Sequence, residues 1–188
     1  MLTFTDHWLD QASRLDSPNF GERPAADDIS LIVVHNISLP PGEFGGPHID
    51  ELFTNRLNPD AHPYFASIAG LEVSSHFLIR RDGAVRQYVA CDQRAWHAGR
   101  SQWRERENCN DFAIGIELEG TDDSPYTDDQ YQQLAALVTA LRRAYPAIAA
   151  DAIVGHCDIA PGRKTDPGPA FDWTRLARLL AAKEETER

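Results

Sequence analysis

The sequence FAIGIEL, residues 112–118, is the strongest single indication of how this chain folds. Its length and apolar content are typical of a buried strand. Side chains alternate along a strand, so its aliphatic residues share one face while Glu117 shares the other face with Glu119. By this pattern the two carboxylates are equal candidates for lining a polar cleft, and a solvated sheet face is the alternative.

Four further segments have the character of strands. Leu31–His35 (LIVVH) is a continuous apolar run, as expected for a strand buried on both faces. Ile153–His156 is a shorter run of the same kind. Ser75–Arg80 and Val85–Val89 flank a turn with a central Asp-Gly pair, which predicts an antiparallel hairpin.

Helical patterns lie between and after these strands. Thr127 and Gln130 form a capping-box pattern ahead of an apolar stripe, which predicts the clearest helix. Short helices are expected over 7–14 and 49–57, and Asp172 is expected to cap a final helix. That final helix is expected to bury three side chains: Trp173, Leu176 and Leu180.

Strands interleaved with helices, together with one antiparallel hairpin, indicate an α/β fold with a mixed central β-sheet flanked by helices. The length of 188 residues suits a single domain spanning 1–188, with its core at about 17–180. Residues 91–111 are rich in charge and tryptophan and are expected to form a long loop.

Composition argues against several classes of function. The formal net charge of −11 repels polyphosphate, so we expect no nucleic-acid partner. No apolar run is long enough for a membrane helix, and the N-terminus lacks the basic and apolar regions of a secretory signal. We therefore expect a cytoplasmic protein with no membrane partner and no obligate protein partner. Three cysteines without a CxxC pair predict free thiols rather than disulfides or a thiolate zinc site.

Three candidate metal ligands lie at or after strand ends. His35 and His156 each close an apolar run, and Asp166 follows in a loop rich in Pro and Gly. Two imidazoles and one carboxylate with an open fourth position are the arrangement of a catalytic zinc site. Alternatives stay open on this spacing, because a histidine at a strand end often hydrogen-bonds loop carbonyls and Asp166 could start a turn.

A zinc hydrolase also needs a base for the attacking water and a positive charge for the oxyanion. Glu117 and Glu119 are the candidates for the base. Lys164 lies two residues before Asp166, so a ligand at that aspartate would hold the ammonium group near the metal. A solvated loop lysine is the alternative.

The remaining histidines carry weaker signals. His76 alternates with apolar residues in a strand and is expected in the core or in support of a metal ligand. Trp96 and His97 form an aromatic pair in a loop, which suits either a substrate wall or a loop anchor. Three others lack any supporting motif and are expected at the surface or in loops: His7, His48 and His62.

Seven segments in this order resemble the type 2 N-acetylmuramoyl-L-alanine amidases, and most closely the cytoplasmic branch that acts on 1,6-anhydro-muramyl peptides in cell-wall recycling. The resemblance runs from about Ser17 to Leu180. The segments are VVHNISLPPGEFGGP (33–47), HPYF (62–65), SSHFLIRRDG (74–83), RAWHAG (94–99), NDFAIGIELEGTD (110–122), YTDDQYQQLAAL (126–137) and GHCDIAPGRKTDPGP (155–169).

The resemblance implies a single bound zinc ion with three ligands: His35, His156 and Asp166. It implies that Glu117, rather than Glu119, is the catalytic acid and base, and that Lys164 supports the transition state. It places four residues in the substrate groove: Asn36, Trp96, His97 and Ala160. The implied fold is that of phage amidases and peptidoglycan recognition proteins. The implied activity is hydrolysis of the amide between the lactyl group of (1,6-anhydro-)N-acetylmuramic acid and L-alanine in muropeptides.

The chain departs from this family at two positions. Basic residues that would hold substrate carboxylates commonly stand where this chain has Glu72 and Asn108. Compensation by other arginines is a hypothesis, with four candidates: Arg80, Arg81, Arg104 and Arg106.

Two rival functions are less well supported by the sequence. Non-catalytic peptidoglycan-binding modules of the same fold usually lose a zinc ligand, whereas this chain keeps all three together with Glu117 and Lys164. A zinc peptidase of different specificity would often carry an HExxH helix, which this chain lacks. The expected partner is a small-molecule muropeptide substrate.

Overall fold

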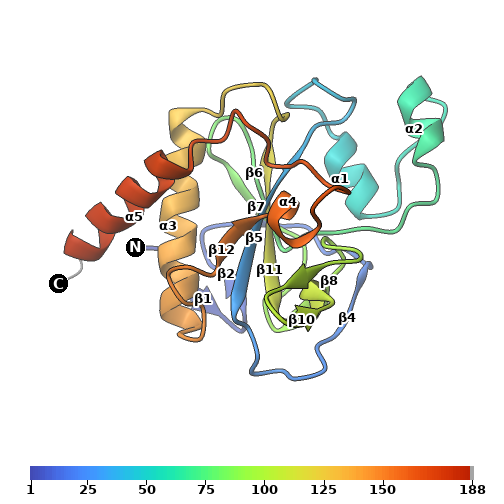
Figure 1. Ribbon diagram of the computed structural model, residues 1–188. Coiled ribbons are helices and arrows are strands. Elements are labelled where there is room, and N and C mark those ends of the chain that lie inside the picture. Colours follow the sequence, from blue (N-terminus) through green and yellow to red (C-terminus); the bar gives the residue numbers. More distant parts are fainter. Residues whose placement is uncertain (187–188) are drawn as a thin grey trace.

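A mixed six-stranded sheet forms the centre of the computed structural model, which describes residues 1–186 (Figure 1). Its strands, in spatial order, are β12 (Ile153–Gly155), β5 (Leu31–Ile37), β11 (Ala113–Glu119), β6 (Phe77–Ile79), β7 (Val85–Gln87) and β3 (Ser13–Arg14). Neighbouring strands are parallel except for the antiparallel pair of β6 and β7. The expected hairpin, the buried strands and the α/β class with a mixed sheet are all confirmed.

Helices and short strand pairs surround this sheet. The helices are α1 (His48–Phe53), α2 (Pro63–Ser67), α3 (Asp128–Ala144), α4 (His156–Ile159), α5 (Trp173–Thr186) and a 3₁₀ turn at Cys109–Asp111. The short strands are β1 (Phe4–Thr5), β2 (Trp8–Leu9), β4 (Phe20–Glu22), β8 (Gln93–Ala95), β9 (Gln102–Trp103) and β10 (Arg106–Glu107). No helix within residues 1–186 is long and apolar enough to cross a membrane.

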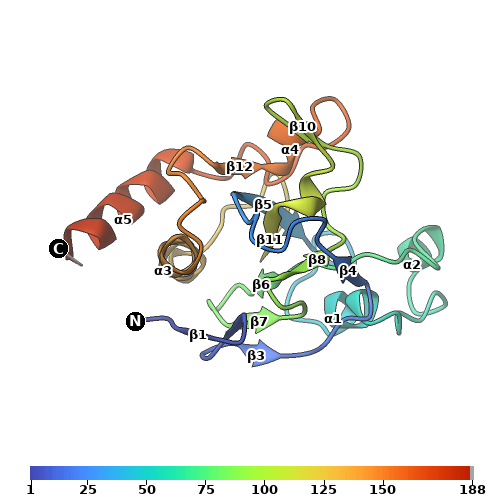
Figure 2. The same cartoon turned by 90° about the horizontal axis from the view of Figure 1, so that it is seen from below.

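The two faces of the sheet differ in what covers them. On one face α3 packs on the sheet and against α5 (Figures 1 and 2). Alternate residues of β5 and β11, such as Val34 and Ile116, enter this core together with Leu134 and Leu137 of α3. The opposite face of the same two strands carries His35 and the carboxylates of β11, because side chains alternate along each strand. His35 and these carboxylates therefore lie on the face of the sheet opposite α3.

The predicted capping box at the start of α3 is present. The Thr127 hydroxyl accepts from the Gln130 amide at 3.1 Å, and the Gln130 side chain accepts from the Thr127 amide at 3.1 Å. The Thr127 hydroxyl also donates to the Arg81 carbonyl at 2.7 Å. The cap therefore provides acceptors for backbone amides at the start of α3 and connects the helix to the β6–β7 turn.

The expected helix over 7–14 is wrong. Asp6 and His7 have positive φ angles of 47° and 67°, which turn the chain between β1 and β2. The Leu9 amide then donates to the Gln87 side chain at 2.7 Å, and β3 pairs with β7. Hydrogen bonds with the backbone of β7 and with the Gln87 side chain therefore favour extended structure in this segment.

Two other expectations need correction. Residues 91–111 are not loop throughout, because β8 pairs with β4 and β9 pairs with β10. In α5, Leu176 is buried and Leu180 half-buried, but Trp173 is 36% exposed and packs its ring against Phe171. The expected cap is present, since Asp172 accepts from the Arg175 amide at 2.9 Å.

Replacing the cap residue of α3 should destabilise the protein. We expect Thr127→Ala to lower the free energy of unfolding by about 1 kcal/mol or slightly more, because the first turn of α3 loses its side-chain acceptor. Urea denaturation followed by circular dichroism measures this. Thr139→Ala, on the same helix, is the control. Its hydroxyl bonds back to the Ala135 carbonyl, so its removal should change stability little. Equal effects of the two changes would contradict the prediction.

Candidate metal centre

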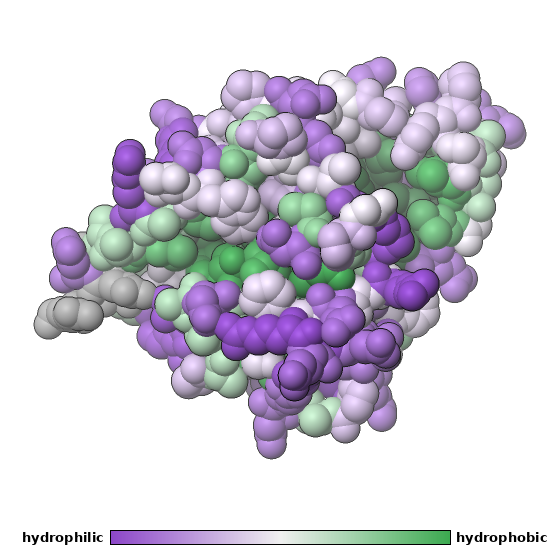
Figure 3. All heavy atoms as spheres, in the orientation of Figure 1, coloured by the Kyte–Doolittle hydropathy of each residue, from purple (hydrophilic) through white to green (hydrophobic). Residues whose placement is uncertain are grey.

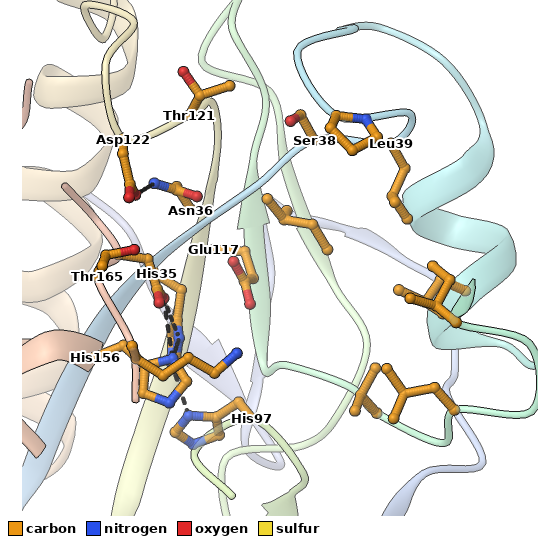
Figure 4. Close-up of a pocket in the computed structure, with 18 of the residues that line it drawn as sticks. His35, Asn36, Ser38, Leu39, His97, Glu117, Thr121, Asp122, His156 and Thr165 are labelled. Atoms are coloured by element: carbon orange, nitrogen blue, oxygen red, sulfur yellow. Dashed lines mark hydrogen bonds and ion pairs between the residues drawn. The ribbon is translucent and has the colours of Figure 1, made fainter. Parts of the chain in front are cut away.

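Three parallel strands bring the polar residues to one edge of the sheet. β5 and β11 pair in a register that sets His35 directly opposite Glu117. β12 pairs with the other side of β5, and His156 follows it as the first residue of α4. The carboxyl ends of parallel strands are the usual place for a ligand site, because they open onto one crevice. Figure 4 shows His35, Glu117 and His156 around this crevice.

The loop after α4 brings Asp166 back to the same edge. The Cys157 amide donates to the Asp166 carbonyl at 3.0 Å. Pro167 packs onto Gly155, where an added Cβ would lie 2.8 Å from the proline Cδ. The glycine therefore leaves the space that lets this loop lie against the end of β12. Asn36 also holds it, by donating to the Pro167 carbonyl at 3.2 Å and to Asp122 at 2.8 Å.

The three candidate ligands form a nearly equilateral triangle of donor atoms. The Nδ1 atoms of His35 and His156 lie 3.0 Å apart, and Asp166 Oδ2 lies 3.1 Å and 3.0 Å from them. A tetrahedral zinc ion with bonds of about 2.0–2.1 Å needs donor atoms about 3.3 Å apart, so small adjustments would suffice. The donor atoms thus fit a single metal ion.

The chemistry of the donors supports the same reading. His156 Nε2 lies 3.0 Å from the Ala98 carbonyl, which can only accept a hydrogen bond. In the neutral ring the opposite atom, Nδ1, then presents a lone pair to the carboxylate of Asp166. Burial lowers the pKa of His35 to about 4, so the ring of His35 is neutral at pH 7. A cation between these groups would remove the repulsion among their lone pairs.

Glu117 differs from Glu119 in its surroundings, although both are buried. Glu117 lines the crevice, and its Oε2 has no hydrogen-bond partner among the described residues. Burial, helped by the nearby charge of Asp166, raises its pKa well above the usual range, with Lys164 opposing. Glu119 instead accepts from the Gly45 amide at 2.7 Å and from the Arg81 amide at 3.2 Å.

The crevice is a pocket of about 680 Å³ with two unlike sides. Its polar side carries the three candidate metal ligands, Glu117 and Lys164. Lys164 is exposed at the rim. Its other side is largely apolar and includes Leu52, Phe53, Tyr64, Ile68, Leu71 and Val73. Figure 3 shows apolar residues gathered in a hollow beside α1 and α2. The pocket can therefore hold a ligand with both polar and apolar parts.

The four expected groove residues lie in different places. Asn36 and Trp96 line the pocket. His97 lines it too, but its Nδ1 lies 2.9 Å from His35 Nε2. Ala160 lines a second hollow of about 410 Å³, together with Asn108. Arg163 borders both hollows.

The four arginines proposed to compensate for Glu72 and Asn108 have other partners. Arg80 pairs with Asp50 and Glu119, Arg104 with Asp151, and Arg106 with Asp28. Arg81 donates to the Glu119 and Pro125 carbonyls. None of the four lines the two hollows formed by the described residues.

The buried support beneath the pocket was predicted only in part. His76 is buried as expected, where its Nδ1 accepts from the Gly115 amide at 3.0 Å. Asn110 was not singled out, yet its side-chain oxygen accepts from the amides of His97 and Ala98 at 3.1 Å and 2.8 Å. An asparagine after a charged loop carries no sequence signal for such a role.

Removing the charge of Glu117 should stabilise the metal-free protein. The folded-state pKa is raised, so the charged form costs stability above that pKa. This cost is absent below the unfolded-state pKa of about 4.3. We expect Glu117→Gln to raise the Tm at pH 8 but not at pH 4, by about 2–4 °C for each kcal/mol gained. Calorimetry in the presence of a chelator measures this.

Glu119→Gln is the matched control for this change. It weakens the contacts to Gly45 and Arg80, so its Tm at pH 8 should fall. A gain for Glu117→Gln of the same size at both pH values would contradict the assignment of a buried, unpaired carboxylate.

Known proteins with similar sequences and structures are amidases. The family model for N-acetylmuramoyl-L-alanine amidase matches residues 25–169. The 1,6-anhydro-N-acetylmuramyl-L-alanine amidase AmpD of Escherichia coli (strain K12) is 64% identical over 179 residues, which cover 95% of this chain and 97% of that protein. The crystal structure of a selenomethionine derivative of AmpD has a TM-score of 0.92 and 62% identity, and the match covers 96% of this chain and 99% of that one.

A more distant structure includes a bound ligand. The Escherichia coli amidase AmiD, in complex with the substrate anhydro-N-acetylmuramic acid-L-Ala-D-gamma-Glu-L-Lys, has a TM-score of 0.60 and 29% identity. That match covers 95% of this chain and 65% of the AmiD chain. The family model spans most of the sequence, and the AmpD relative matches nearly all of it. The chain therefore belongs to the N-acetylmuramoyl-L-alanine amidase family.

Proposed function

We propose that this protein is a zinc-dependent amidase of peptidoglycan recycling. It would hydrolyse the amide between the lactyl group of 1,6-anhydro-N-acetylmuramic acid and L-alanine in muropeptides. The observation that carries the proposal is the triangle of His35, His156 and Asp166 donor atoms beside the unpaired carboxylate of Glu117. Family membership and the names of the relatives support the same activity.

Zinc is the metal that best suits this donor set. Two imidazole nitrogens and one carboxylate oxygen are typical ligands of catalytic zinc, with a fourth position left for water or substrate. A structural zinc site would use four protein ligands, more often with sulfur. A zinc ion held by His35, His156 and Asp166 would supply Lewis-acid activation of a water molecule and of the amide carbonyl.

Glu117 would move the proton in this reaction. Its carboxylate faces the pocket and would take a proton from the attacking water, then return it to the departing nitrogen of alanine. A raised pKa suits both steps, because the group must accept and then release the proton near neutral pH. Lys164, at the rim of the same pocket, would stabilise the negative charge that develops on the carbonyl oxygen.

The proposed substrate follows the relatives rather than the shape of the pocket. AmpD is named as an amidase of 1,6-anhydro-N-acetylmuramyl-L-alanine, and AmiD was solved with an anhydro-muramyl tripeptide. The apolar side of the pocket suits the sugar ring, and its polar side suits the amide. Asn36, Trp96 and Ala160 remain proposed substrate contacts. A cytoplasmic location remains a prediction.

A non-catalytic peptidoglycan-binding module is the alternative function. Such a module needs the groove but needs no base beside the metal. Glu117 is buried and its Oε2 has no hydrogen-bond partner among the described residues, so its charged form lowers the stability of the fold. A carboxylate that costs stability in this way is more easily explained by a catalytic role than by a structural one.

Product analysis tests the activity directly. We expect the purified protein to release free tripeptide from anhydro-N-acetylmuramyl-tripeptide, to lose this activity with a chelator and to regain it with zinc. Mass spectrometry follows the products. If the zinc-loaded protein binds the muropeptide without cleaving it, the binding module is the correct description.

Neutralising the proposed base should reduce the rate with little effect on binding. We expect Glu117→Gln to lower kcat by about 10²–10⁴-fold, because the proton transfer loses its carrier. Asp123→Asn is the control, since it removes the same charge from an exposed position on the pocket rim. Its kcat should stay within about threefold of that of the unaltered protein. Steady-state kinetics with equal zinc content would decide, and similar losses in both variants would contradict the role of Glu117.

A further inference from the structure

Two adjacent residues hold the outer nitrogens of both candidate metal-binding imidazoles. His35 Nε2 lies 2.9 Å from Nδ1 of His97, and His156 Nε2 lies 3.0 Å from the carbonyl of Ala98. His35 lies on β5, and His156 directly follows β12, the neighbouring strand. The segment His97–Ala98 therefore contacts both rings from beneath the pocket, as the dashed line to His97 in Figure 4 illustrates.

These contacts are compatible with the tautomers that a metal ion requires. The Ala98 carbonyl can only accept a hydrogen bond, so His156 donates to it from Nε2. In the tautomer that binds a metal ion, Nδ1 then has a lone pair on the side of Asp166. The same state of His35 requires that its Nε2–H donate to His97 Nδ1, which must then be unprotonated. The proton of His97 then lies on Nε2, a buried atom without a partner among the described residues.

Three further residues hold the segment in place. The side-chain oxygen of Asn110 accepts from the amides of both His97 and Ala98. The ring of His97 lies on Gly115, where an added Cβ would come within 2.5 Å of it. Arg163 donates to the Ala98 carbonyl at 2.7 Å. These contacts leave the His97 ring and the Ala98 carbonyl little freedom to move.

We propose that His97 is a positioning residue, which orients His35 for metal binding through its Nδ1 acceptor, and that Asn110 braces the two-residue segment that orients both histidines. The inference rests on the metal site of the proposed function and assigns His97 a role other than substrate contact. Support of this kind is typically worth 10–100-fold in metal affinity.

Two substitutions at His97 separate the acceptor from the shape of the ring. His97→Phe keeps a ring over Gly115 but removes the acceptor, whereas His97→Asn can place its side-chain oxygen near the former Nδ1 position. Zinc affinity is measured by competition with a chromophoric chelator, without substrate. We expect His97→Phe to bind zinc about 10–100-fold more weakly and His97→Asn to bind within about threefold of the unaltered protein.

Stability of the metal-free protein provides a second readout. His97→Phe should lower its Tm only slightly, because the lost contact with His35 Nε2 is partly offset by removal of Nε2, a buried atom without a partner among the described residues. If His97 acted only by filling space, His97→Asn would lower both the Tm and the zinc affinity more than His97→Phe. Zinc affinity unchanged in His97→Phe, or equally weak in both variants, would overturn the proposal.

Asn110 gives an independent test if a His97 variant fails to fold. Asn110→Asp keeps an oxygen for both amides and should bind zinc more tightly than Asn110→Ala, which keeps none. Equal affinities would overturn the bracing role. Tight zinc binding without cleavage of the muropeptide would contradict the proposed substrate but not this inference. Failure of the unaltered protein to bind zinc would overturn both.

Discussion

The parallel pairing of β5 with β11 is the constraint on which the site depends. Its register sets the backbone of His35 beside that of Glu117, and strand alternation turns both side chains away from the α3 core. β12 then adds His156 from the other side of β5. Because the hydrophobic residues of the same strands hold this register against α3, the packing of one face determines the chemistry of the other.

Charge within the pocket differs from charge over the molecule as a whole. The net charge of −11 would repel a substrate that carries carboxylates. At the pocket, Lys164 and Arg163 stand among acidic residues, and a bound divalent cation would add two positive charges. Several of the other arginines are paired with carboxylates, which removes them as free cations. The charges around the pocket are therefore more mixed than the net charge of the molecule suggests.

Much of the fold and the candidate ligands could be predicted from the sequence. The apolar patterns of the longer strands and helices, and the motifs that resemble the amidase family, can each be identified within a short stretch of sequence. The strands, the α3 capping box and the grouping of His35, His156 and Asp166 follow from such signals. The choice between Glu117 and Glu119 could not follow from alternation, since both share a face. What separates them is the loop that brings the Gly45 amide onto Glu119, a tertiary contact. Strands of two or three residues, such as β3 and β8–β10, are too short to carry a period, and the segment over 7–14 was consequently predicted as helix.

Strand alternation also limits how a gene for such a protein can change. Deleting one codon within β11 ahead of Glu117 would turn its carboxylate into the α3 core and bring aliphatic side chains into the crevice. The same holds for β5 and His35. Insertions and deletions in the loops leave the strand register unchanged, so they should cost little stability. Insertions and deletions should therefore accumulate between the strands during evolution. The two central strands should change only by substitution.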